Sequence, residues 1–202
     1  MTHYITPQGA DKVREFKYKG GSISISYQHL WSPLAEKVVS YVPKTVAPNL
    51  ITVIGTIIHI IGNMSLIVQG KGNNLWPLSL LFFGFCVFAY YTLDNVDGKQ
   101  ARRTKSSSPL GMCMDHGCDV LGVSFIALGV GQLIGATSST TILFSSQVAV
   151  LGTFWASVWS QYHSKGVLVL GKFISNLGKI NAVDDGIPFV AFLGFFTFFV
   201  GQ

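Results

Sequence analysis

Four aspartates stand in two closely spaced pairs in a chain that has few acidic residues. Asp94 and Asp97 lie three residues apart, and Asp115 and Asp119 lie four residues apart. Residues at these spacings share one face of a helix, so two helix ends joined by a short loop would bring all four carboxylates together. Oxygen-only ligand sets of this size suit Mg²⁺ or Mn²⁺, and the carboxylates would repel one another without a cation. The spacing therefore predicts a site for divalent cations.

The residues between the two pairs are small or basic at several positions. Gly98, Ala101 and Gly111 leave room for the close approach of a helix or a ligand. Arg102 offers a bidentate donor that is suited to phosphate. Acidic metal ligands beside a phosphate-binding cation indicate chemistry on a phosphate ester, although the spacing alone does not name the reaction.

Few charges and long apolar runs surround this acidic cluster. The 202 residues include 14 Lys or Arg and nine Asp or Glu, 49% are hydrophobic, and the mean hydropathy is +0.46. This composition excludes a disordered chain and is unusual for a water-soluble domain. The basic residues are spread between apolar runs instead of being gathered with aromatics in one patch, so no nucleic acid partner is expected. An ionised aspartate near a bilayer core is costly unless it is paired, metal-bound or open to water.

Four apolar segments are long enough to cross a bilayer, and a fifth is shorter. The four lie at about 50–69, 75–94, 111–136 and 139–160, and the fifth begins at Ile187 and offers about 14 apolar residues. The predicted fold class is therefore all-α: a polytopic membrane helix bundle of about five transmembrane segments. The last helix is expected to be incomplete, as in a fragment or short form of a longer protein.

The basic residues divide unevenly between the loops. Thirteen of the 14 fall before the first span, in the loop 97–110 or in residues 161–186. Loops rich in Lys and Arg stay on the cytosolic side of a membrane, which places the amino terminus and the loop after Asp97 in the cytosol.

Residues 26–42 precede the first span and mix apolar with charged residues at helical spacing. They predict an amphipathic helix that lies in the membrane interface, with Pro33 near its start. A soluble surface helix packed on the bundle is the alternative. We accordingly divide the chain into a cytosolic amino-terminal segment, 1–47, which contains this helix, and a membrane domain, 48–202.

The acidic cluster and the linker between its two pairs, residues 98–114, resemble the signature of the CDP-alcohol phosphotransferase family. Every gap of that signature is kept in the run Asp94-x2-Asp97-Gly98-x2-Ala101-Arg102-x8-Gly111-x3-Asp115-x3-Asp119. The flanking residues are similar to the choline/ethanolamine phosphotransferase branch, from Ala47-Pro48-Asn49 at the first span to Asp115-His116-Gly117 in the third. The resemblance covers roughly residues 17–185 and is strongest over 91–119.

The resemblance implies a reaction and a set of residue roles. The reaction is the transfer of phosphocholine or phosphoethanolamine from CDP-choline or CDP-ethanolamine to the hydroxyl of diacylglycerol, with release of CMP. Two divalent ions, Mg²⁺ or Mn²⁺, would be held by the four aspartates, Asp94, Asp97, Asp115 and Asp119. The CDP group would be bound by Asn49, Gly98, Ala101, Arg102 and Gly111.

The residue that takes the proton from the acceptor hydroxyl stays open between His116 and Asp119, and a purely structural His116 paired to a carboxylate is a further alternative. An imidazole titrates near neutrality, whereas a metal-bound carboxylate is a poor base. His116, however, is adjacent to Asp115 and so points about 100° away from it around the helix. Asp185, just before the fifth span, is a candidate to orient this histidine.

The resemblance also implies where the protein works and with what. It would be an integral membrane protein of the endoplasmic reticulum or Golgi, a homodimer among membrane lipids, with its active site facing the cytosol. Two alternatives remain: an inactive family member acting as an accessory subunit of a membrane assembly, and a divalent-cation transporter. Choline and ethanolamine are not distinguished, because both substrates share the cytidine and pyrophosphate that this motif binds.

Overall fold

The computed structural model describes residues 5–15, 24–69, 75–136, 139–163 and 182–200. Among these residues there are helices and connecting turns but no β-strand, so the predicted all-α fold is confirmed. In chain order the elements are α1 (Pro7–Glu15), the short π-helix η1 (Tyr27–Trp31), α2 (Ser32–Tyr41), α3 (Pro48–Ile67), α4 (Pro77–Thr104), α5 (Pro109–Leu133), α6 (Thr140–His163) and α7 (Ala182–Val200).

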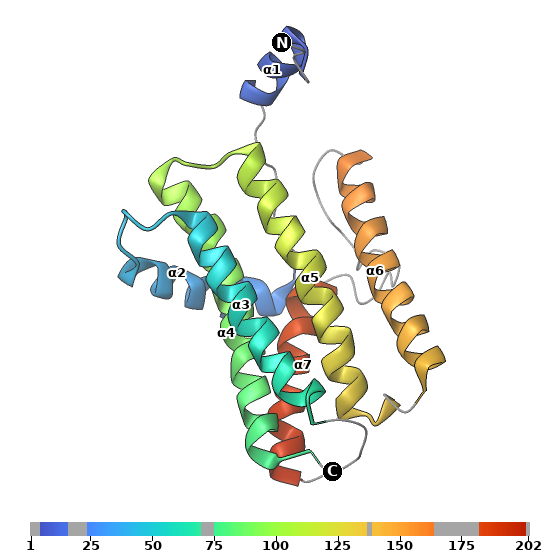
Figure 1. The fold of residues 1–202 in the computed structure, drawn as a ribbon. Helices are drawn as coiled ribbons and strands as arrows, with labels where there is room; N and C mark the ends of the chain where they lie inside the picture. Colours follow the sequence, from blue (N-terminus) through green and yellow to red (C-terminus); the bar gives the residue numbers. More distant parts are fainter. Residues whose placement is uncertain (1–4, 16–23, 70–74, 137–138, 164–181, 201–202) are drawn as a thin grey trace.

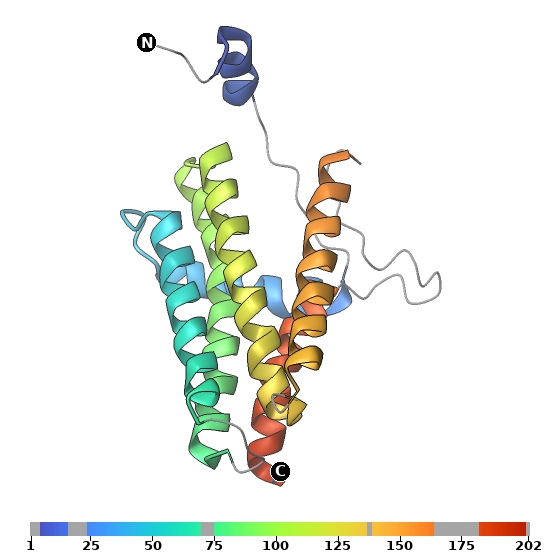
Figure 2. The same ribbon diagram turned by 45° about the vertical axis from the view of Figure 1, so that its right-hand side comes forward.

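The long helices form a bundle in which the helix axes are roughly aligned. Figures 1 and 2 show α3 to α7 along the long axis of the bundle, whereas α2 lies across it. Three helices, α3, α4 and α5, are long and apolar enough to cross a membrane. The apolar parts of α6 and α7 within the described residues are shorter, Thr140–Ala156 and Asp185–Val200. All five predicted segments are helical, and the protein is an integral membrane helix bundle.

Two predicted boundaries are wrong. The expected loop 97–110 is largely helix, because α4 continues to Thr104 and only residues 105–108 separate it from α5. Charged residues there favour a loop by composition, but basic side chains also favour the last turn of a helix, where they face the negative end of its dipole. The fifth segment also starts earlier than Ile187, since α7 begins at Ala182 and contains Pro188.

Local sequence explains where the three spanning helices begin. Each has a proline in its first turn, Pro48, Pro77 or Pro109, where the missing amide hydrogen has no helical partner to lose. The third start is also capped, because the Ser108 hydroxyl accepts a hydrogen bond from the Gly111 amide at 3.0 Å. The preceding helix is ended by Lys105, whose φ of 57° is left-handed and cannot continue a helix.

Glycines let the spanning helices approach one another closely. A Cβ at Gly55 of α3 would lie 3.2 Å from the Leu93 Cβ of α4. A Cβ at Gly194 of α7 would lie 3.2 Å from the Gly84 Cα of α4. Small residues at such crossings are the usual means by which membrane helices maximise packing, and here they hold α4 between α3 and α7.

The predicted helix over residues 26–42 is present as η1 and α2, and it is packed on the bundle by one side. Ala35 and Val39 are buried against Ile51 of α3 and Val96 of α4. Tyr41 on the same helix is 77% exposed. The helix therefore carries one face that fixes it to the bundle and another that is open to its surroundings, and its place in the membrane interface stays a prediction.

Candidate metal and nucleotide site

The short turn between α4 and α5 brings the two acidic pairs to the same depth. Asp97 lies seven residues before the end of α4 and Asp115 six residues after the start of α5, so at 1.5 Å per residue they stand about 10 Å and about 9 Å from the turn. Asp94 and Asp119 each lie ten residues from the same helix ends, at about 15 Å. Antiparallel helices joined this way must therefore place the pairs opposite each other.

Carboxylate oxygens of this cluster are close enough to share cations. Ligand atoms of Asp94, Asp97 and Asp115 lie within 4.8 Å of one another, and so do those of Asp115, His116 and Asp119. Asp115 belongs to both groups and links the α4 pair to the α5 pair. Hard oxygen donors without a thiolate are the set that Mg²⁺ and Mn²⁺ prefer, so the residues present fit a divalent cation.

Two of these aspartates receive hydrogen bonds from neighbouring helices. The Thr52 hydroxyl of α3 donates to Asp97, whose exposed fraction is 6%. The Tyr90 hydroxyl of α4 donates to Asp119 Oδ1 at 2.9 Å. Neither donor was expected from the sequence, although Tyr90 precedes Asp94 by four residues and so shares its helix face.

His116 lies inside the cluster. Its Nδ1 is 3.7 Å from Asp115 Oδ2, and its side chain is 24% exposed. The backbone directions of adjacent helical residues differ by about 100°, but the side-chain torsions of a histidine and an aspartate are enough to bring their tips together. Its role as a base remains a prediction.

The expected nucleotide-binding residues gather around the same helix ends. A Cβ at Gly111 would lie 3.5 Å from Asn49 Oδ1, so the start of α3 meets the start of α5 here. A Cβ at Gly98 would lie 3.4 Å from the Arg102 Nη1, so the guanidinium folds back over Gly98 beside Asp97. Ala101 lies one turn further along α4 and is half-buried. The structure thus pairs Gly111 with Asn49 and Gly98 with Arg102, and the binding of a nucleotide by these residues and Ala101 stays a prediction.

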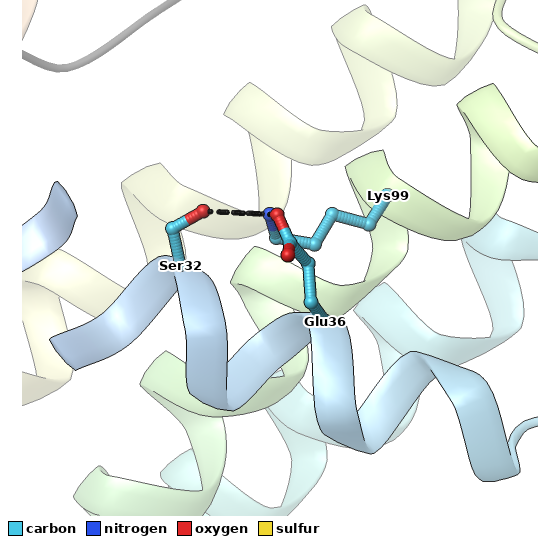
Figure 3. A network of polar contacts seen from close by, with 3 residues as sticks. All are labelled: Ser32, Glu36 and Lys99. Carbon is cyan, nitrogen blue, oxygen red and sulfur yellow. Dashed lines mark hydrogen bonds and ion pairs between the residues drawn. The ribbon is translucent and has the colours of Figure 1, made fainter. Parts of the chain in front are cut away.

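Other residues of the linker hold α2 in place. Lys99 Nζ donates to the Ser32 hydroxyl at 2.9 Å and lies 3.1 Å from Glu36 Oε1 (Figure 3). Glu36 in turn has its pKa lowered below the ordinary 4.5, first by the hydrogen bond from Lys99 and then by the charge of that ammonium group. A contact with α2 was not among the roles expected of the motif.

Two more side chains near the end of α4 contact the end of α2 and the segment after it. Arg103 Nη1 donates to the carbonyls of Val39 at 2.6 Å and Val42 at 2.7 Å. Gln100, fully buried, donates through Nε2 to the Pro43 carbonyl at 2.9 Å. The last carbonyls of a helix have no helical partners, and a cationic donor there also suits the helix dipole. Lys99, Gln100 and Arg103 therefore contact α2 or the segment that follows it.

Asp185 has partners in the amino-terminal segment. Both of its carboxylate oxygens accept from the Ser24 hydroxyl at 3.0 Å, and Ser26 donates to the same carboxylate. Ser24 is fully buried. These contacts join the segment before η1 to the start of α7. The proposed action of Asp185 on His116 stays a prediction, and the side chain of Asp184 lies outside the described residues.

Fold and site together define a class of protein: a helical membrane protein with an acidic cluster that could hold a metal ion where two long apolar helices meet, and with an arginine in the last turn of the first of them. Comparison with known proteins identifies the class more closely. Residues 45–197 match the family model described as CDP-alcohol phosphatidyltransferase. The chain belongs to this family.

Individual relatives agree with this assignment. The chain is 34% identical over 192 residues to CDP-alcohol phosphatidyltransferase class-I family protein 3 of Dictyostelium discoideum, covering 93% of this chain and 45% of that protein. It is 30% identical over 200 residues to choline/ethanolaminephosphotransferase 1 of Arabidopsis thaliana, covering 98% and 49%. It is 33% identical over 179 residues to cholinephosphotransferase 1 of Bos taurus, covering 85% and 42%. The chain therefore spans less than half the length of each of these three relatives.

Proposed function

We propose that the protein transfers phosphocholine or phosphoethanolamine from CDP-choline or CDP-ethanolamine to the hydroxyl of diacylglycerol, giving phosphatidylcholine or phosphatidylethanolamine and CMP. The observation that carries the proposal is the meeting of the two acidic pairs where α4 leads into α5, with Arg102 in the last turn of α4. The relatives named for cholinephosphotransferase and choline/ethanolaminephosphotransferase supply the substrate class.

The four aspartates would hold the divalent cations, two ions of Mg²⁺ or Mn²⁺. When bound, these ions neutralise the pyrophosphate and stabilise the charge that develops on the transferred group and on the departing CMP. Asp115 is shared by both groups of ligand atoms, since its carboxylate lies within 4.8 Å of Asp94 and Asp97 on α4 and of His116 and Asp119 on α5. Replacing it would affect both cation positions at once.

The residues around the aspartates would bind and orient the nucleotide. Arg102 donates to a phosphate, because a guanidinium offers two parallel donors to phosphate oxygens. Gly98 and Gly111 add no side chain of their own, so the cytidine diphosphate can approach the backbone beside Arg102 and Asn49. Ala101 adds only a methyl group to the next turn of α4, which leaves room for the same ligand.

His116 would act as the base in the transfer. It takes the proton from the diacylglycerol hydroxyl, the oxygen forms a bond to the β-phosphorus, and the bond from that phosphorus to the CMP oxygen breaks. Asp119 is less suited to this role, because it already accepts a hydrogen bond from Tyr90 and belongs to the ligand set. Asp115 lies 3.7 Å from the imidazole and would stabilise its protonated form.

The site would face the cytosol from an endoplasmic reticulum or Golgi membrane, among membrane lipids and within a homodimer. The loop between α4 and α5 carries Lys105 and follows Arg102 and Arg103, which is the charge pattern of a cytosolic loop. CDP-linked substrates are water-soluble, whereas diacylglycerol is not, so a site at the cytosolic ends of spanning helices can receive both.

Turnover by the purified protein tests this function. We expect CMP release in detergent with diacylglycerol, Mg²⁺ and either CDP-choline or CDP-ethanolamine, and we expect loss of at least about 1,000-fold in Asp115→Asn. The matched control is Asp11→Asn, which removes an acid of α1 that pairs with Arg14 on the surface. A wild type that binds CDP no better than Asp115→Asn and releases no CMP would contradict the proposal.

A further inference from the structure

We infer that Thr52 and Tyr90 are positioning residues that fix the carboxylates of Asp97 and Asp119 in their cation-binding orientation. The inference rests on the proposed function, because it concerns how the same aspartates are held. It goes further by assigning this task to two hydroxyls outside the family motif, one on α3 and one on α4.

Tyr90 reaches Asp119 across the interface between α4 and α5. Its side chain is 4% exposed, and its hydroxyl lies 2.9 Å from Asp119 Oδ1. A carboxylate has two oxygens and several lone pairs, so a donor on one oxygen fixes the rotation of the group and leaves the other oxygen for a cation. Tyr90 itself comes from the helix that carries Asp94, so one element positions ligands of both pairs.

Thr52 holds Asp97 from α3. Its hydroxyl donates to Asp97 Oδ2, and it is 7% exposed. The same hydroxyl lies 3.3 Å from the Pro48 carbonyl of its own helix, which is the longer of its two contacts. A threonine hydroxyl inside a helix commonly donates to the carbonyl of the preceding turn. The hydrogen bond from Thr52 to Asp97 is therefore not needed to form α3.

The tyrosine is in turn held by residues of α3 and α5. Its ring packs on the His59 ring with a centroid separation of 4.4 Å, and His59 Nε2 lies 2.9 Å from the Gly122 carbonyl. Gly122 is needed for this arrangement, because a Cβ there would lie 2.9 Å from the Tyr90 hydroxyl. His59, fully buried, thus fixes the tyrosine between α3 and α5.

Hydrogen-bonded partners behind the ligands matter to a metal site because they set the orientation and basicity of the ligands. Loss of one such partner typically lowers metal affinity about 10-fold to 100-fold. Thr52 and Tyr90 act on one aspartate of each pair, Asp97 and Asp119. Their removal should therefore act on cation binding without changing the number of ligands.

The test is Mn²⁺ binding by the purified full chain, measured through the electron paramagnetic resonance signal of the free ion. We expect Thr52→Val and Tyr90→Phe each to weaken Mn²⁺ binding about 10-fold to 100-fold. Thr52→Ser, which keeps the hydroxyl, should bind within about twofold of wild type. Thr52→Val and Tyr90→Phe keep the volume of the side chain almost unchanged, and thermal unfolding in detergent should show that both variants are folded.

Matched controls separate the hydroxyl contact from packing. Thr56 lies one turn along α3, is 5% exposed, and donates to the Thr52 carbonyl instead of to an acid. Tyr91 adjoins Tyr90, is 1% exposed, and packs its ring against Trp31. Thr56→Val and Tyr91→Phe should bind Mn²⁺ as wild type does.

The outcomes distinguish this inference from the proposed function. Wild-type affinity in Thr52→Val or Tyr90→Phe, or an equal loss in its control, would overturn the assignment of that residue. Mn²⁺ binding that is absent in wild type, or unchanged in Asp115→Asn, would instead contradict the metal site itself and with it the proposed function.

Discussion

Lys99 of the linker between the acidic pairs lies 3.1 Å from Glu36 of α2, so the segment that carries the site also holds the helix lying across the bundle. The Lys99 side chain is only 11% exposed, whereas that of Glu36 is 68% exposed. The lysine side chain is thus largely shielded from solvent, whereas the carboxylate side chain is mostly exposed. This pair therefore joins α2 to the last part of α4.

Acid should weaken this contact. Glu36 has a pKa lowered below 4.5 in the folded protein, so its stabilising effect is complete above that value and is lost as the pH falls through the lower, folded value. Trp31 packs on Phe88 and Tyr91 of α4 and reports on the seating of this segment. In a variant with Trp31 as the sole tryptophan, its emission should shift to the red below about pH 4.5, and this shift should be absent in Glu36→Gln. An identical shift in both proteins would exclude Glu36 as its cause.

Arg102 and Arg103 should differ sharply on substitution, although they are adjacent. Arg103→Gln loses hydrogen bonds to the carbonyls of Val39 in α2 and of Val42 just after it, and should lower the free energy of unfolding by about 1 kcal/mol, because its side chain is partly solvated. Arg102→Gln should leave the melting temperature unchanged and raise the KM for the CDP substrate about 10-fold or more. Thermal unfolding in detergent and steady-state kinetics check the pair. Equal effects of both variants on KM would contradict the division of roles.

Two glycines of α5 offer a comparison around Tyr90. Gly122→Ala would place a Cβ 2.9 Å from the Tyr90 hydroxyl and should displace it from Asp119, with Mn²⁺ affinity falling about 10-fold. A Cβ on Gly117 would meet no neighbouring atom of the described residues within 4 Å, so Gly117→Ala should leave Mn²⁺ affinity unchanged. Titration with Mn²⁺ measures both affinities. Equal affinities of the two variants would contradict the claim that Gly122 acts on Asp119 through Tyr90.

The contact between α4 and α7 should be sensitive to side-chain size at its closest point. A Cβ at Gly194 would lie 2.9 Å from Phe83 Cδ1 and 3.2 Å from the Gly84 Cα, so Gly194→Val should destabilise the protein by about 1–3 kcal/mol. Gly152 of α6 has open space beside it within the described part of the chain, and Gly152→Val serves as the control. Thermal unfolding in detergent measures the difference. Similar melting temperatures for both variants would show that α7 is not packed here as described.

Much of this site could be predicted from the sequence because its chemistry resides in one continuous segment. The segment from Asp94 to Asp119 carries all four aspartates of the candidate site, and helical periodicity alone places each pair on one face. The contacts from elsewhere in the chain could not be found in this way. Thr52 approaches Asp97 only because α3 crosses α4 at Gly55, and the spacing of residues within one helix contains no information about that crossing.

The errors in the helix boundaries have a similar origin. Charge in the linker favours a loop when composition alone is considered, yet Lys99 and Arg103 are helical and α2 offers each of them an acceptor. The contacts with α2 therefore favour a helix at these residues, which local composition alone does not predict. The start of α7 differs from the prediction for a related reason, since Asp185 is satisfied by Ser24 and Ser26 and need not lie in a loop.

The central claim, a cation-dependent site for a CDP-linked substrate, is tested most directly by equilibrium binding of radiolabelled CDP-choline to the purified chain. We predict saturable binding in the presence of Mg²⁺ that is abolished by EDTA and in Asp115→Asn, and that is weakened about 10-fold or more in Arg102→Gln. Binding that persists unchanged in EDTA and in Asp115→Asn would contradict the claim.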